Sequence, residues 1–383
     1  MRFATAILLL TLATLAAERK PQPHKGVFPP GVKPVGPYSP GVVAGGFLYV
    51  SGQGARDASG QLAPDFDDQV RQCLENVKAI LESEKLTTTH VVSASVYLTD
   101  LKNYEALNRA WAKYFPRDPP ARTVIGVTRM PTETPVEIAV VALLDLKRKK
   151  LVSVPGQQMQ EPVTAAINVG DRVFFSGGPG LSQSGALPKE PADQVKLVIS
   201  SAESALKQSG LDMRHIVYAN IYVDPGMPLK MLAEVIEEAI PDETARTIIQ
   251  TSSLPFGAHI IISGVASRGQ RRVGGHCTSV SDTVYCSGRV GTIRQSLESL
   301  KADLKAGKFD LSRVVSSNVY LDDIDEFAAM NKVYAGYFSS VPPSRTTVQP
   351  WKRVAELSLP PTTGVAPSRD SSPRAQVSIV AVR

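Results

Sequence analysis

The sequence is poor in the residues that most often hold metals or carry catalytic chemistry. Its 383 residues include five scattered histidines and three cysteines, with no Cys-x-x-Cys pair and no metal-ligand spacing. It also has no glycine-rich phosphate loop, so we expect neither a metal nor an organic cofactor. Aromatic residues make up 6% of the chain, and the net charge is only +6. No basic run is interleaved with aromatics, so nucleic acid is an unlikely partner.

Long apolar runs are missing from all but the N-terminus. Residues 1–17 have the pattern of a secretory signal: Arg2, an apolar core, and small residues before a cleavage point near Ala16 or Ala17. The apolar run is short for a membrane span, although an uncleaved anchor or a buried helix is the alternative. We therefore expect export, to the periplasm or the medium, with no stable membrane anchor after cleavage. Residues 18–32 are predicted to be a proline-rich linker with little structure.

Three blocks of sequence recur three times along the chain. A strand-like block ends in Ser-Gly, a second alternating block carries a tyrosine and ends at an acidic turn, and a third begins with a small residue, arginine and threonine. The serines are Ser51, Ser176 and Ser287, the tyrosines are Tyr97, Tyr222 and Tyr320, and the arginines are Arg122, Arg246 and Arg345.

The segments between these blocks have helical periodicity. One face of the helix expected after Ser51 carries Val70, Cys73, Leu74, Val77, Ile80 and Leu81. Each repeat then reads strand, strand, helix, strand, helix, strand, strand, which predicts an α+β unit whose sheet carries two helices on one face. The units are expected at 33–150, 151–269 and 270–383, the third with a shortened helix region and a late insertion.

Cys277 and Cys286 flank a predicted hairpin that turns at Ser281-Asp282. Counting outward from the turn places the two cysteines opposite each other, at a separation compatible with a disulfide. A disulfide suits an exported protein, and the alternative is two small apolar residues at strand positions.

The motifs "GPYSP", "VSGQ", "YEALNRAWAKYF" and "PPARTVIGVTRMPTETPVEIAVVAL" resemble signatures of the RidA (YjgF, endoribonuclease L-PSP-like) family. The resemblance covers all three units and is closest in the first. It implies chorismate-mutase-like units, which in this family assemble as homotrimers with clefts between subunits. Three units in one chain would then form an intramolecular pseudo-trimer, expected to be a monomer overall, with one inherited arginine for each cleft.

The resemblance also implies a reaction, the hydrolysis of small 2-imino or 2-enamino acids to 2-keto acids and ammonia. Arg122 matches the arginine that binds the substrate carboxylate, and Arg246 and Arg345 hold the equivalent places. The planar guanidinium suits this task because it donates two parallel hydrogen bonds to a carboxylate. Glu137 matches the acidic residue that directs water, and its apolar setting predicts a raised pKa.

The resemblance also implies further pocket residues, but not all of them recur in every unit. Those matching the family are Tyr38, Ser51 and Asn108, with Ser176, Ser287 and Asn331 at equivalent places in the other units. Ile261 stands fifteen residues after Arg246, as Glu137 does after Arg122, and in the third unit, whose last strand is displaced by the insertion, Ser378 is expected at that place. Neither residue can act as a base; His259 is a weaker substitute. At most one cleft is expected to be competent, and the arginine that faces Glu137 is left open.

Two other functions remain as alternatives. Two degraded copies favour an exported binder of small carboxylate-bearing metabolites, or a degenerate structural pseudo-trimer. Endoribonuclease activity, attributed to some relatives, would require a basic groove with stacking aromatics.

Overall fold

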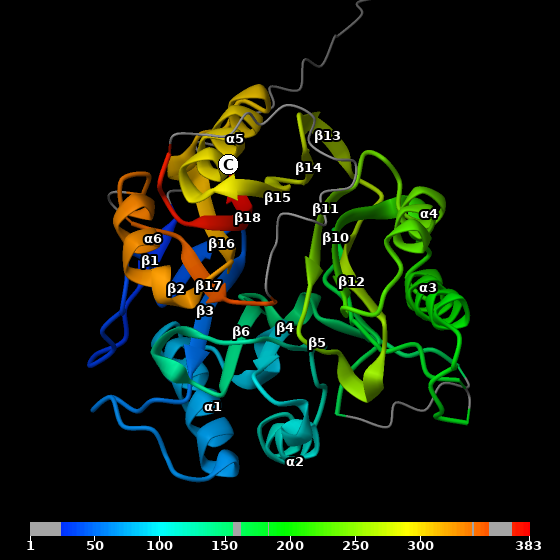
Figure 1. Cartoon of the computed structure of the whole chain (residues 1–383), viewed down its shortest axis with the longest axis horizontal. Helices are drawn as coiled ribbons and strands as arrows, with labels where there is room; N and C mark the ends of the chain where they lie inside the picture. Colours follow the sequence, from blue (N-terminus) through cyan, green and yellow to red (C-terminus); the bar gives the residue numbers. More distant parts are fainter. Residues whose placement is uncertain (1–23, 156–161, 183, 339–340, 352–369) are drawn as a thin grey trace, which may run out of the picture.

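Each of the three repeats forms a six-stranded sheet with two helices on one face (Figure 1). The structure is a computed structural model that describes residues 24–155, 162–182, 184–338, 341–351 and 370–383. The predicted signal, the start of the linker and most of the late insertion lie outside these residues. Within the described part of the chain, no helix is long and apolar enough to cross a membrane.

The first unit has eight main elements and the sheet order β1-β2-β3-β6-β4-β5. Strands β4 and β5 pair in parallel, on either side of a helical crossover, whereas β6 pairs antiparallel with β3 and β4. The elements are β1 (Lys25–Val27), β2 (Gly41–Ala44), β3 (Phe47–Gly54), α1 (Phe66–Ser83), β4 (Val91–Leu98), α2 (Tyr104–Tyr114), β5 (Ala121–Gly126) and β6 (Val136–Leu143).

The second and third units repeat this topology, which confirms the predicted α+β architecture. The second unit contains β7 (Lys150–Val152), β8 (Ala166–Asn168), β9 (Val173–Phe175), α3 (Pro191–Lys207), β10 (Ile216–Val223), α4 (Leu229–Ala239), β11 (Ala245–Gln250) and β12 (Ile260–Ala266). The third contains β13 (Arg271–Gly274), β14 (Cys277–Val280), β15 (Thr283–Thr292), α5 (Ile293–Ala306), β16 (Val314–Leu321), α6 (Phe327–Tyr334), β17 (Ser344–Val348) and β18 (Arg374–Val382).

The linker prediction is wrong for Lys25–Val27, which form β1 and pair antiparallel with β2. Val27 is 2% exposed, and Lys25 Nζ lies 2.8 Å from the Glu84 carboxylate. Three residues are too few for alternation to show in a sequence, so the surrounding prolines and glycines dominated the pattern.

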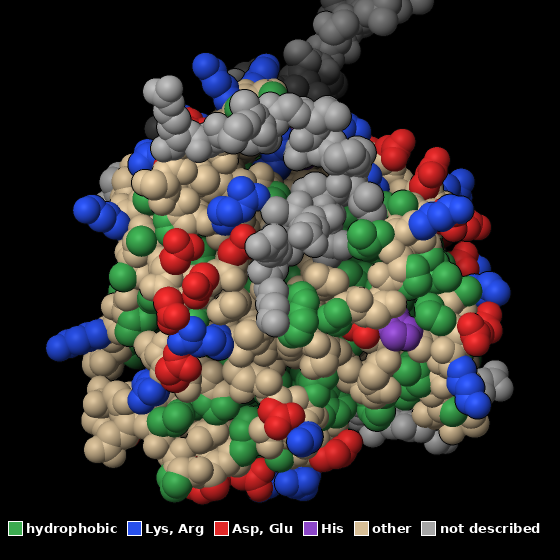
Figure 2. Space-filling model, in the orientation of Figure 1, with side chains coloured by type: hydrophobic (Ala, Val, Ile, Leu, Met, Phe, Trp, Pro, Cys, Tyr) green, Lys and Arg blue, Asp and Glu red, His purple; other side chains and the backbone are tan. Residues whose placement is uncertain are grey.

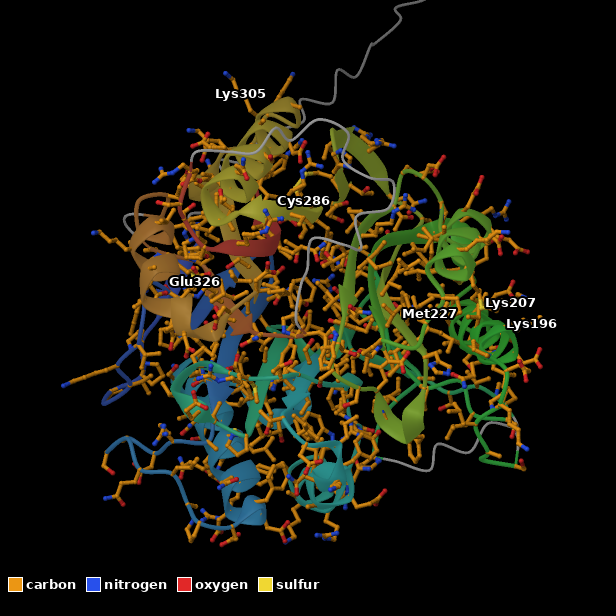
Figure 3. All side chains as sticks on the ribbon, in the orientation of Figure 1. Lys196, Lys207, Met227, Cys286, Lys305 and Glu326 are labelled. Carbon is orange, nitrogen blue, oxygen red and sulfur yellow. A yellow bond between two sulfur atoms is a disulfide. The ribbon has the colours of Figure 1, made fainter. Side chains whose placement is uncertain are left out.

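The helices pack their predicted apolar faces on the sheets. All six residues predicted for α1 are buried, and Asp65 caps the helix by accepting a hydrogen bond from Asp68 N. On α3, the exposed side chains of Lys196 and Lys207 project away from the sheet (Figure 3). Amphipathicity therefore fixes which side of each sheet faces the helices, and leaves the other side for the neighbouring units.

The three sheets meet around a common centre. Strand β5 contacts β9, β11 contacts β15 and β17 contacts β3, so the units form a closed ring. Tyr97, Tyr222 and Tyr320 share one apolar cluster there, and the ring of Phe47 packs edge-on against Phe174. A cavity of about 120 Å³ also lies among the sheets, with lining residues from all three units.

The hairpin of β14 and β15 has the predicted register, with Cys277 opposite Cys286. Their Cα atoms are 4.1 Å apart and a disulfide joins them. Cys73 is a free, buried thiol on α1.

Candidate active site between the first and third units

The three recurring serines hold the neighbouring unit's arginine strand. Ser51 Oγ accepts a 2.8 Å hydrogen bond from Arg345 N and donates to Ser39 O at 2.6 Å. Ser176 and Ser287 accept from the backbone nitrogens of Arg122 and Arg246 in the same way. The sequence suggested substrate-binding serines, but the Ser51 hydroxyl is already engaged with two backbone groups. The serine pattern therefore marks the contact between units.

This contact places each arginine beside the sheet of the next unit. Arg122 faces the second unit, Arg246 faces the third, and Arg345 faces the first. Because Glu137 belongs to the first unit, Arg345 is the arginine that shares its site.

Glu137 is the second residue of β6 and is 6% exposed, while Arg345 on β17 is 4% exposed. Burial raises the pKa of Glu137 to about 8, because a carboxylate loses its hydration in an apolar interior. The positive charge of Arg345 and a hydrogen bond with the Thr347 backbone act in the opposite direction, but they do not outweigh burial. The interface thus holds a fixed cation beside a carboxyl group that titrates near neutral pH.

Gly52 makes room for this carboxyl group. A methyl group on Gly52 would overlap Glu137 Oε1. Glycine in the Ser-Gly block is therefore required by a side chain that lies 85 residues later in the chain. Sequence reasoning noted the Ser-Gly pair but not this function.

Aromatic rings surround the Arg345 guanidinium. Its Cζ lies 4.9 Å from the ring centre of Tyr334, 5.2 Å from that of Tyr38 and 5.5 Å from that of Phe327. Cation–π contacts hold a guanidinium in place without neutralising its charge. Tyr38 and Phe327 are half-buried and Tyr334 is buried, and burial raises the pKa of Tyr38. Tyr334 and Phe327 were not singled out from the sequence, because aromatic residues on a helix are usually core residues.

Asn331 lies in the same site. A methyl group on Gly36 would lie 2.8 Å from both Asn331 Oδ1 and Arg345 Nη2, so these two groups face the same glycine. Asn331 Oδ1 is buried and has no hydrogen-bond partner among the described residues. This oxygen is available to accept a hydrogen bond from a bound molecule.

The interface between the first and second units lacks the carboxyl group. Arg122 Nη2 donates a 2.7 Å hydrogen bond to Asn108 Oδ1, and its guanidinium lies 5.1 Å from the centre of the Trp111 ring. Ile261 occupies the place of Glu137, since it pairs with Tyr222 as Glu137 pairs with Tyr97. Asn108 was predicted to share the site of Glu137 and Tyr38, but helix α2 faces the second unit, so it accompanies Arg122 instead.

The interface between the second and third units also lacks a carboxyl group at this place, but the residue there differs from the expected one. Gln376, not Ser378, pairs with Tyr320 across the sheet. Ser378 lies two residues further along β18, opposite Asn318. The prediction of Ser378 was wrong because the insertion removes a fixed spacing from Arg345, whereas the register is set by pairing with β16.

The suggested substitute base is not beside Arg122 either. His259 Nδ1 lies 2.8 Å from Asp224 Oδ1, and its backbone nitrogen donates to Gln194 Oε1. Among the described residues there is also no group of three or more His, Cys, Asp or Glu placed to hold a metal ion.

Comparisons with known proteins agree with the threefold repeat. A family model described as Endoribonuclease L-PSP matches residues 30–144, 158–268 and 275–360. A RutC family protein from Pyrococcus horikoshii is 40% identical over 112 residues, which cover 29% of this chain and 89% of the relative. A RutC family protein from Aquifex aeolicus is 42% identical over 114 residues, covering 29% of this chain and 90% of the relative.

Solved structures match one unit at a time. RidA from an Antarctic Psychrobacter is 34% identical and covers 29% of this chain and 91% of its own, with a TM-score of 0.29. Escherichia coli TdcF with bound serine is 30% identical and covers 31% of this chain and 98% of its own, with a TM-score of 0.30.

Proposed function

This chain belongs to the Rid/YjgF/L-PSP family and carries three copies of the family unit, and from that premise we propose that it is a hydrolytic deaminase of small 2-imino or 2-enamino acids. The products are a 2-keto acid and ammonia. One observation carries the proposal: Glu137, whose pKa is raised by burial, shares a buried interface with Arg345.

Arg345 would bind the substrate carboxylate. Its guanidinium is held by three aromatic rings, and no carboxylate among the described residues forms a salt bridge with it, so its charge is available to a ligand. Burial strengthens the attraction because the interior screens charge less than water does. Asn331 Oδ1 would accept a hydrogen bond from the substrate nitrogen, which is protonated in an iminium ion.

Glu137 would move the proton. As a carboxylate it removes a proton from water while the water oxygen bonds to the imine carbon, giving a carbinolamine. The protonated Glu137 then returns that proton to the nitrogen. The C–N bond breaks as the hydroxyl oxygen forms the carbonyl of the 2-keto acid, and the hydroxyl proton leaves with the ammonia as ammonium. Catalysis of this kind works best when the pKa of the group is close to the working pH, and a value of about 8 meets that condition.

Binding of carboxylates without turnover is a second candidate function for the other two interfaces. Each keeps its arginine, but Ile261 or Gln376 stands where the base would be. Ribonuclease activity gains no support, since acidic and basic side chains are interspersed on the face seen in Figure 2.

We also propose that the protein is a monomer and is exported. The ring already uses the unit contacts that a homotrimer would need, and the export proposal rests on the predicted signal in residues 1–17. Gel filtration of the mature chain and the N-terminal sequence of the protein recovered outside the cytoplasm test these two points.

The experiment for the reaction is ammonia release from freshly generated 2-iminobutanoate, with Glu137→Gln as the variant. Glutamine keeps the size of the side chain and removes the proton-transfer group. We expect wild type to accelerate hydrolysis above buffer and Glu137→Gln to match buffer. Equal rates for wild type and buffer would contradict the proposal for this substrate.

A further inference from the structure

The interface between the second and third units is more open than the other two. Between β13 and β14 the chain has only Gly275 and His276, whereas residues 28–40, including Tyr38, separate β1 from β2. Arg246 is correspondingly half-buried, while Arg122 and Arg345 are 3% and 4% exposed. A molecule in solution can therefore approach Arg246 without displacing a loop like that of the first unit.

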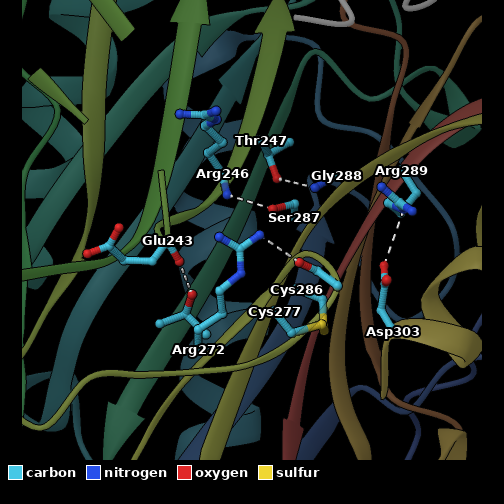
Figure 4. The surroundings of a disulfide bond; sticks show 12 residues. Glu243, Arg246, Thr247, Arg272, Cys277, Cys286, Ser287, Gly288, Arg289 and Asp303 are labelled. Atoms are coloured by element: carbon cyan, nitrogen blue, oxygen red, sulfur yellow. Dashed lines mark hydrogen bonds and ion pairs between the residues drawn. A yellow bond between two sulfur atoms is a disulfide. The ribbon is translucent and has the colours of Figure 1, made fainter. Parts of the chain in front are cut away.

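Further cationic side chains gather around this arginine. Arg272 Nη2 donates to Gly275 O at 3.0 Å and its Nη1 to Asp242 O at 3.4 Å, which places it beside the start of β11 (Figure 4). Arg289 lies across the Cys277–Cys286 disulfide from Arg272 in the same view. The disulfide joins β14, which follows His276, to β15, which carries Arg289.

His276 is in electrostatic contact with all three arginines. Burial lowers the pKa of His276 most, and Arg289, Arg272 and Arg246 lower it further against the opposing charge of Asp303, so His276 lies within the field of all three guanidinium groups. The carboxylates that face the group are Asp303, which pairs with Arg289 at 3.3 Å, and Asp242, which acts on Arg246. Two carboxylates beside three guanidinium groups leave one positive charge in excess.

Two buried polar atoms point to a missing partner. Arg246 Nη1 and Gln376 Oε1 have no hydrogen-bond partner among the described residues. Gln376 is 5% exposed, and its amide lies against Gly288, whose nitrogen donates to Thr247 Oγ1 next to Arg246. Buried polar groups are rarely left unpaired, because each costs free energy unless a partner is supplied.

We propose that this interface binds a compact oxyanion carrying two negative charges, a phosphate group or a dicarboxylate, and does not turn it over. Arg246 would take two ligand oxygens with its planar fork, and Arg272 would add a second positive charge at the open side. An uncharged amide at position 376 suits this role, because a carboxylate there would repel the anion. The proposal is independent of the deaminase reaction, which uses the opposite interface.

Calorimetric titration of the whole mature chain with inorganic phosphate, malonate and acetate tests the proposal. We expect one phosphate or malonate per chain to bind in an Arg246-dependent manner, and acetate to bind at least about tenfold more weakly because it carries one charge. Losing a charge-assisted hydrogen bond typically weakens binding by about tenfold or more, so Arg246→Ala should have that effect. Arg272→Ala, on an exposed side chain, should weaken binding several-fold without affecting folding.

The matched control is Arg271→Ala. Arg271 is also exposed and adjacent on β13, but its side chain points to the other face, so its loss changes net charge equally and should leave affinity unchanged. Tighter binding of phosphate than of malonate would assign the site to phosphate esters. Tighter binding of malonate would assign it to dicarboxylates, and either result supports the proposal. Absence of phosphate and malonate binding to wild type, or equal losses of affinity in Arg271→Ala and Arg272→Ala, would overturn it. Neither variant should change ammonia release from 2-iminobutanoate, so this test and the test of the deaminase reaction can fail separately.

Discussion

Replacing Glu137 by glutamine should remove activity and at the same time stabilise the protein at alkaline pH. The side chain is fully buried, and its neutral form is the one that the interior accepts. Gln376 occupies the equivalent place in the third unit, so the fold accommodates an amide there. The site would then be a case in which a catalytic group is kept at a cost in stability.

The size of this cost follows from the pKa. The native protein holds the Glu137 proton up to about pH 8, whereas the unfolded chain releases it near 4.5. The native state therefore binds more protons in this window, and the unfolding free energy falls as pH rises through it. At about 1.4 kcal/mol for each pH unit, the full effect is about 5 kcal/mol, of which about 3 kcal/mol develops between pH 6 and pH 9.

The assay is urea unfolding of wild type and Glu137→Gln at pH 6, 7, 8 and 9. The difference between the two proteins is the quantity of interest, because titrations common to both cancel. We expect the variant's advantage to grow by about 3 kcal/mol across this range and to level off above pH 8. A difference that stays constant with pH would show that Glu137 titrates like an exposed carboxyl group, and would refute the reasoning.

Three further predictions concern the same residues and the disulfide. Gly52→Ala should lower kcat/KM for 2-iminobutanoate by about 100-fold, because the added methyl group displaces the Glu137 carboxyl; a near-normal rate would show that the carboxyl group is not confined there. The kcat/KM of wild type should rise with pH through a half-maximal value near pH 8, as Glu137 becomes a carboxylate, and a plateau already reached at pH 6 would contradict this. Replacing Cys277 and Cys286 together by serine should lower the unfolding free energy by about 2 kcal/mol, because the disulfide between them is lost. Urea unfolding of the wild type and the double variant, with and without reductant, measures this loss, and no difference between the two proteins would show that the two thiols are free in solution.

Local signals in the sequence were enough to predict the repeated fold. Alternating strands, the apolar face of α1 and the hairpin ending at Cys277 and Cys286 all depend on residues close together in the chain. Strand β1 escaped prediction because three residues carry no periodic signal. Its stability depends on pairing with β2, which lies 13 residues away.

The candidate site was only half predictable for a related reason. Arg345 and Glu137 could each be identified by position, but their meeting depends on which edges of the three sheets adjoin, and no local pattern encodes that. Asn108 was therefore grouped with Glu137, although it binds Arg122 at another interface. Gln376 was missed because an insertion breaks the spacing from Arg345, while cross-strand pairing keeps the register.

The central claim is that one interface, formed by Glu137 and Arg345, carries out the reaction. The most direct measurement is kcat/KM for 2-iminobutanoate in Arg122→Ala, Arg246→Ala and Arg345→Ala, each checked for folding by circular dichroism. Loss of a bidentate contact to a carboxylate should reduce kcat/KM by at least about 100-fold in Arg345→Ala, with the other two variants within a few-fold of wild type. Equal losses in all three, or a loss confined to Arg122→Ala or Arg246→Ala, would contradict the claim.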